Sequence, residues 1–262
     1  MNLAPLRALL KERDYVIYIS GTAASLTAQW VQRIAMAWLV WEHTHSPLWV
    51  GIASAADTLP TVIAALFGGV LADRWNRPRF IALVQLACAL FTVVLAVTQY
   101  FGLLTLTLLI VLRVCLSASV AIVQPARMVL IAELVGLSNV TAAVSVGAIV
   151  FNLARALGPA LAGALIAFSG FAVAFAFNAA CYLAMALAAT LIARHPRAAL
   201  VSAAPGALVE QMAEGCRYVL ARFGVRSLFT LLLVFVLTAR AVEDMLPAFV
   251  AQGLEGGVRG GA

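Results

Sequence analysis

The residues of this chain that could do chemistry are few, and the most unusual of them lie inside long apolar stretches. Asp57 is the one carboxylate within the first six of these stretches, and the arginines Arg33, Arg113 and Arg155 share the same apolar surroundings. A charged side chain at the centre of hydrocarbon costs about 2.5–3.5 kcal/mol on insertion scales. Each therefore needs a partner or water, and an arginine such as Arg33 or Arg113 is the natural partner of Asp57.

Polar residues recur at helical spacing in at least five of the apolar stretches. The groups that would share a helix face are Gln29 with Arg33; Asp57 with Thr61; Arg113 with Ser117 and Gln124; Thr141 with Ser145, Asn152 and Arg155; and Asn178 with Tyr182. We interpret them as lining a wet interior, with Asp57, Arg113 and Arg155 as its polar core and Asn152 and Asn178 as hydrogen-bonding residues. The alternative is that each residue joins two helices or extends to a lipid headgroup.

The elements that must position these residues follow from composition. The chain has 262 residues, of which 64% are hydrophobic, and its mean hydropathy is +1.03. No soluble domain of this size could bury so much apolar surface. Seven stretches are long enough to cross a bilayer as helices. They lie at about 15–41, 48–72, 80–101, 103–125, 139–169, 172–193 and 226–250.

The sequence therefore predicts an all-α integral membrane protein. Six helices form one bundle over 1–193. A cytoplasmic linker over 194–225 opens with a Pro/Ala/Ser-rich segment and continues as an amphipathic helix. A seventh transmembrane helix and a Gly-rich tail occupy 226–262, as the start of a second bundle.

The distribution of basic residues predicts the orientation in the membrane. The net charge of +6 alone would suit nucleic-acid binding. However, 12 of the 17 basic residues, Arg127 among them, fall in the N-terminal lead or in alternate loops. This is the positive-inside pattern, and it places the N-terminus in the cytoplasm. The abundance of arginine and alanine suggests a bacterial source. We therefore expect a multi-pass protein of the bacterial inner membrane, with lipid rather than nucleic acid around it.

Nothing in the sequence predicts an enzyme. The four cysteines are scattered, without metal or disulfide spacing. His43 and His45 have no further ligand beyond Glu42, so a solvated loop is the better interpretation. No nucleophile–base pair or paired carboxylates occur, and the Gly-rich tail lacks the context of a phosphate loop. We expect no metal and no cofactor.

A charged loop between the second and third apolar stretches carries a motif. The segment "GGVLADRWNRPRF", residues 68–80, resembles the G-x-x-x-D-R-x-G-R-[KR]-[KR] loop of the major facilitator superfamily through Gly69, Asp73, Arg74 and Arg77. By this resemblance the glycine allows close packing, and the acid and the arginines form a charge latch. We call the segment 68–80 the gate loop. The chain departs from the motif at Asn76 and Pro78.

Two further motifs agree with this resemblance. Gly158, Pro159 and Gly163 are similar to the G-P-x-x-G-G element of the family's antiporters, where proline bends the helix and glycines allow close approach. Arg113, followed by serines, resembles the fourth-helix motif whose arginine is associated with proton coupling in the family. Four longer segments, including "ARALGPALAG" and "EGCRYVLARFGVRS", resemble the enterobactin-exporter-like, transmembrane-secretion-effector branch.

The resemblance implies a transporter with two six-helix bundles and a substrate cavity between them. The chain would hold the first bundle and one helix of the second, and the missing C-terminal bundle would be a partner in cis or in trans. The implied function is proton-coupled export of amphiphilic small molecules, either drug-like or siderophore-like, with the proton gradient as energy source. The alternative is a truncated or split-gene product without transport activity, acting as a membrane partner for a second half.

Overall fold

The computed structural model describes residues 9–195, 221–222, 224–228 and 230–231. Within residues 59–74, only the backbone is described at 59, 62–63, 65–67 and 69–74. The described part is helical and contains no strand, as the sequence predicts. The expected linker and seventh helix fall almost entirely outside it.

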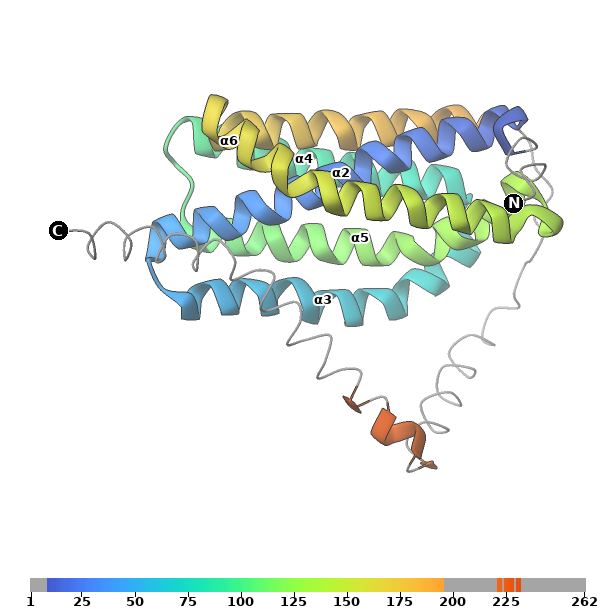
Figure 1. Cartoon of the computed structure of the whole chain (residues 1–262), viewed down its shortest axis with the longest axis horizontal. Coiled ribbons are helices and arrows are strands. Elements are labelled where there is room, and N and C mark those ends of the chain that lie inside the picture. The colour runs from blue at the N-terminus through green and yellow to red at the C-terminus, as the bar shows by residue number, and fades with distance from the viewer. Residues whose placement is uncertain (1–8, 196–220, 223, 229, 232–262) are drawn as a thin grey trace.

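Five long helices make up the described bundle, and they lie side by side with their long axes roughly aligned (Figure 1). They are α2 (Arg13–Thr44), α3 (Pro47–Arg74), α4 (Arg77–Tyr100), α5 (Leu106–Val135) and α6 (Val140–Ile192), with a short 3-10 helix at Leu137–Asn139 before α6. In α6 the backbone is non-helical at Gly170, where φ is 80° and ψ is 172°. The chain reverses there, so α6 contains both the fifth and the sixth expected segments.

Capping residues set several of these helix ends. The Asn76 side chain accepts a hydrogen bond from the Arg79 N–H at the start of α4, and Thr105 accepts one from the Leu108 N–H at the start of α5. Gly136, with φ of 72°, ends α5. This end lies ten residues beyond the expected one at 125, because α5 continues as a helix through Pro125.

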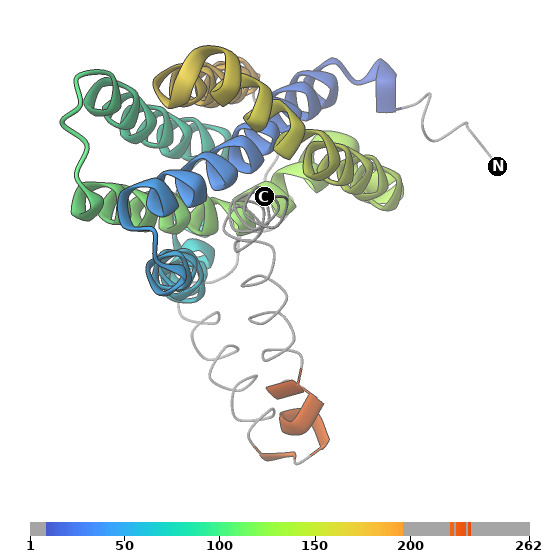
Figure 2. The ribbon, with the colours of Figure 1, turned by 60° about the vertical axis from the view of Figure 1, so that its left-hand side comes forward.

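The helices pack in two groups. The first consists of α6 with α2 and α4, and the second of α3 with α5, with α4 also packing on α5. Figure 2 shows α6 crossing α2 on the side away from α3. Large apolar side chains on one face of α4 are exposed, namely Leu83, Leu86, Leu90, Val93 and Val97. Such a face suits contact with lipid chains.

Three helical segments of the described residues are long and apolar enough to cross a membrane. They are Arg77–Tyr100, Leu106–Val135 and Leu137–Ile192, the last of which reverses at Gly170. The chain is therefore an all-α membrane protein, in agreement with the fold class predicted from composition.

Candidate functional site

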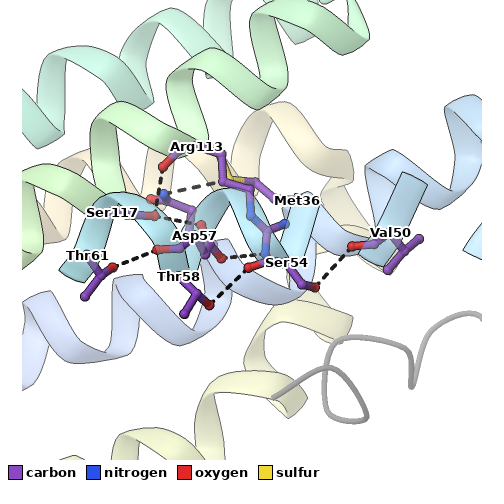
Figure 3. Close-up of polar contacts among 9 residues, drawn as sticks. Met36, Val50, Ser54, Asp57, Thr58, Thr61, Arg113 and Ser117 are labelled. Atoms are coloured by element: carbon purple, nitrogen blue, oxygen red, sulfur yellow. Dashed lines mark hydrogen bonds and ion pairs between the residues drawn. The ribbon is translucent and has the colours of Figure 1, made fainter. Parts of the chain in front are cut away.

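An ion pair between α3 and α5 forms the centre of the candidate site (Figure 3). The Arg113 guanidinium donates through Nη2 to Asp57 Oδ2 at 2.5 Å, and the Ser117 hydroxyl lies 2.7 Å from Asp57 Oδ1. Arg113 and Ser117 are one helical turn apart on α5, so both reach the same carboxylate. Of the two partners expected for Asp57, the structure selects Arg113.

The pair is buried unevenly. The Arg113 side chain is 2% exposed, whereas that of Asp57 is 24% exposed. An arginine so deeply buried requires a counter-charge, because an uncompensated charge in a low-dielectric interior is strongly unfavourable. Asp57 supplies that charge and still has one side open to solvent or to a ligand.

Hydroxyl side chains around the pair are tied to their own helices. Ser54 donates to the Val50 carbonyl, Thr58 to the Ser54 carbonyl and Thr61 to the Asp57 carbonyl (Figure 3). Among the described residues, Arg113 and Ser117 are the side chains bound to the Asp57 carboxylate. The arrangement places one carboxylate between a guanidinium and a hydroxyl of the neighbouring helix, so its charge contributes to the α3–α5 contact.

The other predicted polar-core residues do not join this pair. Arg155 and Asn152 are exposed on the first half of α6, where Arg155 lies over the Trp30 ring and the Asn152 amide donates to the Ala148 carbonyl. Asn178 is fully buried in the second half of α6, and its amide has no hydrogen-bond partner among the described residues. The expected set is therefore distributed over separate places in the bundle.

The gate loop is described in part. For Gly69, Asp73 and Arg74 the structure describes the backbone alone, so their contacts are not among the described ones. Arg77 is described: it is buried and forms an ion pair with Glu133 near the end of α5. The neighbouring glycine, Gly68, is where α3 meets α5, since a Cβ there would collide with the Ile122 backbone.

The two glycines of the helix-bending motif, Gly158 and Gly163, lie in different surroundings. Gly158 is buried against Trp30 of α2, so this glycine allows close approach of two helices. Among the described residues, nothing lies within 4 Å of the position that a methyl group at Gly163 would take, and α6 remains helical through Pro159. The break in the backbone lies further along, at Gly170.

Sequence reasoning missed two buried charged residues, and for the same reason. We expected the fourth helix to end at about 125, which put Arg127 and Glu133 in a loop. The structure contradicts that placement: Arg127 is inside α5 and only 4% exposed, and its Nη2 donates to the Ser25 hydroxyl at 3.3 Å. Gly136 at the end of an apolar run was the signal that could have extended the helix.

The described residues also contain no cluster of three or more His, Cys, Asp or Glu residues able to hold a metal ion. The chemistry that the site offers is that of its ion pairs and hydroxyl groups.

Comparison with known proteins agrees with this architecture. The model of the transmembrane secretion effector family, a branch of the major facilitator superfamily, matches residues 2–259. The staphyloferrin A transporter of Staphylococcus aureus (strain NCTC 8325 / PS 47) is 24% identical over 166 residues, which are 63% of this chain and 42% of the relative. The uncharacterized MFS-type transporter YfiS of Bacillus subtilis (strain 168) is 28% identical over 194 residues, 74% of this chain and 45% of the relative.

The match thus spans less than half the length of both curated relatives, and no solved structure matches the chain significantly. The family match, in contrast, covers nearly every residue and brings with it the helical membrane architecture described above. The chain belongs to the transmembrane secretion effector family of major facilitator superfamily transporters.

Proposed function

We propose that this chain is the N-terminal half of a proton-coupled exporter of amphiphilic small molecules in the bacterial inner membrane. The observation that carries the proposal is the Asp57 carboxylate, held by Arg113 and Ser117 between two membrane helices and 24% exposed. A carboxylate in this position binds a proton only at the expense of its ion pair. Proton binding is thereby linked to the α3–α5 contact.

The transport step would follow from this linkage. When Asp57 is ionised, its charge balances that of Arg113 and holds the two helices together. When Asp57 is protonated, the charge that it contributes to its pair with Arg113 is lost, and the arrangement in which Arg113 is buried becomes less favourable. Such a two-state contact can bias the rocking of two bundles about a site near the middle of the membrane, which is how transporters with internal repeats work.

Further observations support a second bundle, a cytoplasmic N-terminus and a substrate class. The curated relatives are more than twice as long as their matched regions, which supports a second bundle acting together with this one. The bias of basic residues supports a cytoplasmic N-terminus. The name of one relative, a staphyloferrin A transporter, supports siderophore-like molecules as substrates to test first.

Transport in proteoliposomes with an imposed pH gradient tests the proposal. The full-length transporter should move substrate against its concentration gradient only while the proton gradient lasts, and Asp57→Asn should abolish this coupling with insertion intact. Glu42→Gln is a matched control, because Glu42 is exposed and its bonding partner among the described residues is Trp38 of the same helix. Transport by Asp57→Asn that still follows the pH gradient would show that the proton acts elsewhere.

A further inference from the structure

A second buried polar network joins α2, α4 and α5, and the proposed coupling at Asp57 makes no use of it. The Ser25 hydroxyl of α2 is at its centre and donates to Gln85 Oε1 of α4 at 3.4 Å. The same oxygen accepts from Gln29 Nε2, one turn further along α2, at 3.4 Å and from Arg127 Nη2 of α5 at 3.3 Å. Ser25 and Gln85 are fully buried. Three helices thus meet at one hydroxyl group.

Arg127 carries the charge of this network, and its partner there is neutral. The residue is 4% exposed, and within the described part of the chain its guanidinium bonds to the Ser25 hydroxyl. The ion pairs between described residues belong to Arg77, Arg113 and His195. A buried charge without a counter-charge is strongly unfavourable. The network therefore calls for a negative charge that its described side chains do not supply.

The unsatisfied groups of the network are hydrogen-bond donors. Arg127 Nε and Gln85 Nε2 are buried and have no hydrogen-bond partner among the described residues, and both are N–H groups. The hydroxyl of Thr22, on the same face of α2 as Ser25, is also buried without such a partner and can donate as well. The Ser25 oxygen already accepts two hydrogen bonds, which is its full capacity. What the network lacks is therefore an acceptor.

The depth of the network in the bundle bears on the kind of acceptor. The Arg77–Glu133 ion pair shows that α4 begins at the end of the bundle where α5 ends. Gln85 is eight residues after Arg77, the first residue of α4, and Arg127 is eight residues before the last residue of α5. At 1.5 Å per residue, both lie about 12 Å from that end of the bundle. This depth favours a small ion over a lipid headgroup at the membrane surface.

One class of ligand meets both needs. A small anion supplies the negative charge that the Arg127 guanidinium requires, and it accepts several N–H and O–H groups at once. Hydrogen bonds to a charged group are also stronger than those between neutral groups. A water molecule could accept from the same donors, but it would leave the charge of Arg127 unbalanced.

We propose that Arg127, Gln85 and Ser25 form a binding site for a small inorganic anion such as chloride. The bound anion joins α2, α4 and α5 near the end of the bundle at which α4 begins. The site is separate from the Asp57–Arg113 pair, because Arg127 lies about four turns further along α5 than Arg113. The inference goes beyond the proposed export function, which assigns no role to these three residues.

Chloride-dependent stabilisation of the purified full chain in detergent tests the site. Sodium chloride replaces sodium gluconate at constant ionic strength, since gluconate is a large organic anion that a buried site of this kind should exclude. A ligand that binds the folded state raises the unfolding midpoint with its concentration, which yields a dissociation constant. We expect a saturable rise with chloride. Arg127→Met should abolish the rise, and Gln85→Leu should weaken chloride binding about tenfold or more, as expected for the loss of a hydrogen bond to a charged group.

Matched variants separate anion binding from effects on folding. The readout is the change of the midpoint with chloride, so a change in stability that is independent of chloride does not enter. Arg194→Gln removes an exposed arginine beyond the end of α6 and should leave the chloride response intact. Gln85→Leu retains the Arg127 charge and decides the matter if Arg127→Met does not fold.

Two outcomes would overturn the proposal. A midpoint of the unsubstituted chain that does not depend on chloride would mean that water, or a carboxylate beyond the described residues, meets these donors. A chloride response that persists unchanged in Arg127→Met, or in Gln85→Leu if the former does not fold, would place the anion elsewhere. Because no transport is measured, the result is independent of whether Asp57 couples export to protons.

Discussion

Arg77 and Glu133 form an ion pair in which both side chains are buried, with 9% and 6% of their surfaces exposed. Arg77 belongs to the gate-loop motif and is the first residue of α4, and Glu133 is near the end of α5. The gate loop is therefore anchored to its own bundle through Arg77.

Removing one partner of this pair should destabilise the bundle strongly. Glu133→Gln removes the carboxylate that pairs with the buried Arg77 guanidinium, and breaking a buried pair in this way costs about 3–5 kcal/mol. We expect a large fall in the thermal unfolding midpoint of the purified chain, followed by helical circular dichroism. The double variant Arg77→Met with Glu133→Leu should recover most of the loss. A double variant as unstable as the single one would show that the charges are not the reason for the effect.

The Asp57–Arg113 pair should show coupling in a double-mutant cycle. Asp57→Asn and Arg113→Gln each remove one charge, and because the residues touch, their effects on the free energy of unfolding should differ from additivity by about 0.5–3 kcal/mol. The measurement is the unfolding midpoint of both single variants and the double variant. Ser54→Ala is the control, since within the described part of the chain its hydroxyl donates to the α3 backbone. Additive effects of the two charge removals would contradict the pairing.

Two glycines of the same motif should respond in opposite directions to alanine. A methyl group at Gly158 would collide with Trp30 Cβ, and overpacking of this kind costs about 1–3 kcal/mol. Among the described residues, nothing lies within 4 Å of a methyl group placed at Gly163, so Gly163→Ala should be neutral or stabilise α6 by up to about 1 kcal/mol through helix propensity. Unfolding midpoints of the two variants compare them directly. Similar losses at both positions would mean that Gly163 is also a packing site.

Two glycines of α3, Gly68 and Gly51, should also differ in their response to alanine, because Gly68 lies at the close contact of α3 with α5. Gly68→Ala places a methyl group against the backbone carbonyl of Ile122, which cannot move aside as a side chain can. We expect a loss of about 1–3 kcal/mol, and no loss for Gly51→Ala on the same helix, where the space is open. The unfolding midpoint again serves as the measure. A tolerated Gly68→Ala would mean that α3 and α5 separate easily at this end.

How much of the site could be predicted from the sequence depends on the kind of information each residue required. Asp57, Arg113 and Ser117 were accessible, because a lone carboxylate in apolar surroundings demands a cation and helical spacing puts Arg113 and Ser117 on one face. The pairing of Arg113 with Asp57, 56 residues apart in the chain, still needed the packing of α5 on α3. Helical periodicity describes one helix at a time, so it left Arg33 and Arg113 as equal choices.

The errors came from the expected end of the fourth helix at about 125. Pro125 stands at this point, and proline interrupts helices in water. Inside a packed membrane bundle, neighbouring helices and side chains satisfy the freed backbone groups, and α5 continues to Val135. The residues beyond Pro125 were therefore assigned to a loop, and the buried partners Glu133 and Arg127 were missed together.

Arg127 provides the most direct contrast with Arg77, because both are buried arginines that differ in their partners. Arg77 has the carboxylate of Glu133, whereas the described partner of Arg127 is the neutral hydroxyl of Ser25. Burying a charge without a counter-charge is costly, so an apolar side chain of similar volume at such a position should be neutral or stabilising. Arg127→Met should therefore keep or raise the unfolding midpoint, while Arg77→Met lowers it. If Arg127→Met were as unstable as Arg77→Met, Arg127 would have to be held by a counter-charge from a part of the protein beyond the described residues.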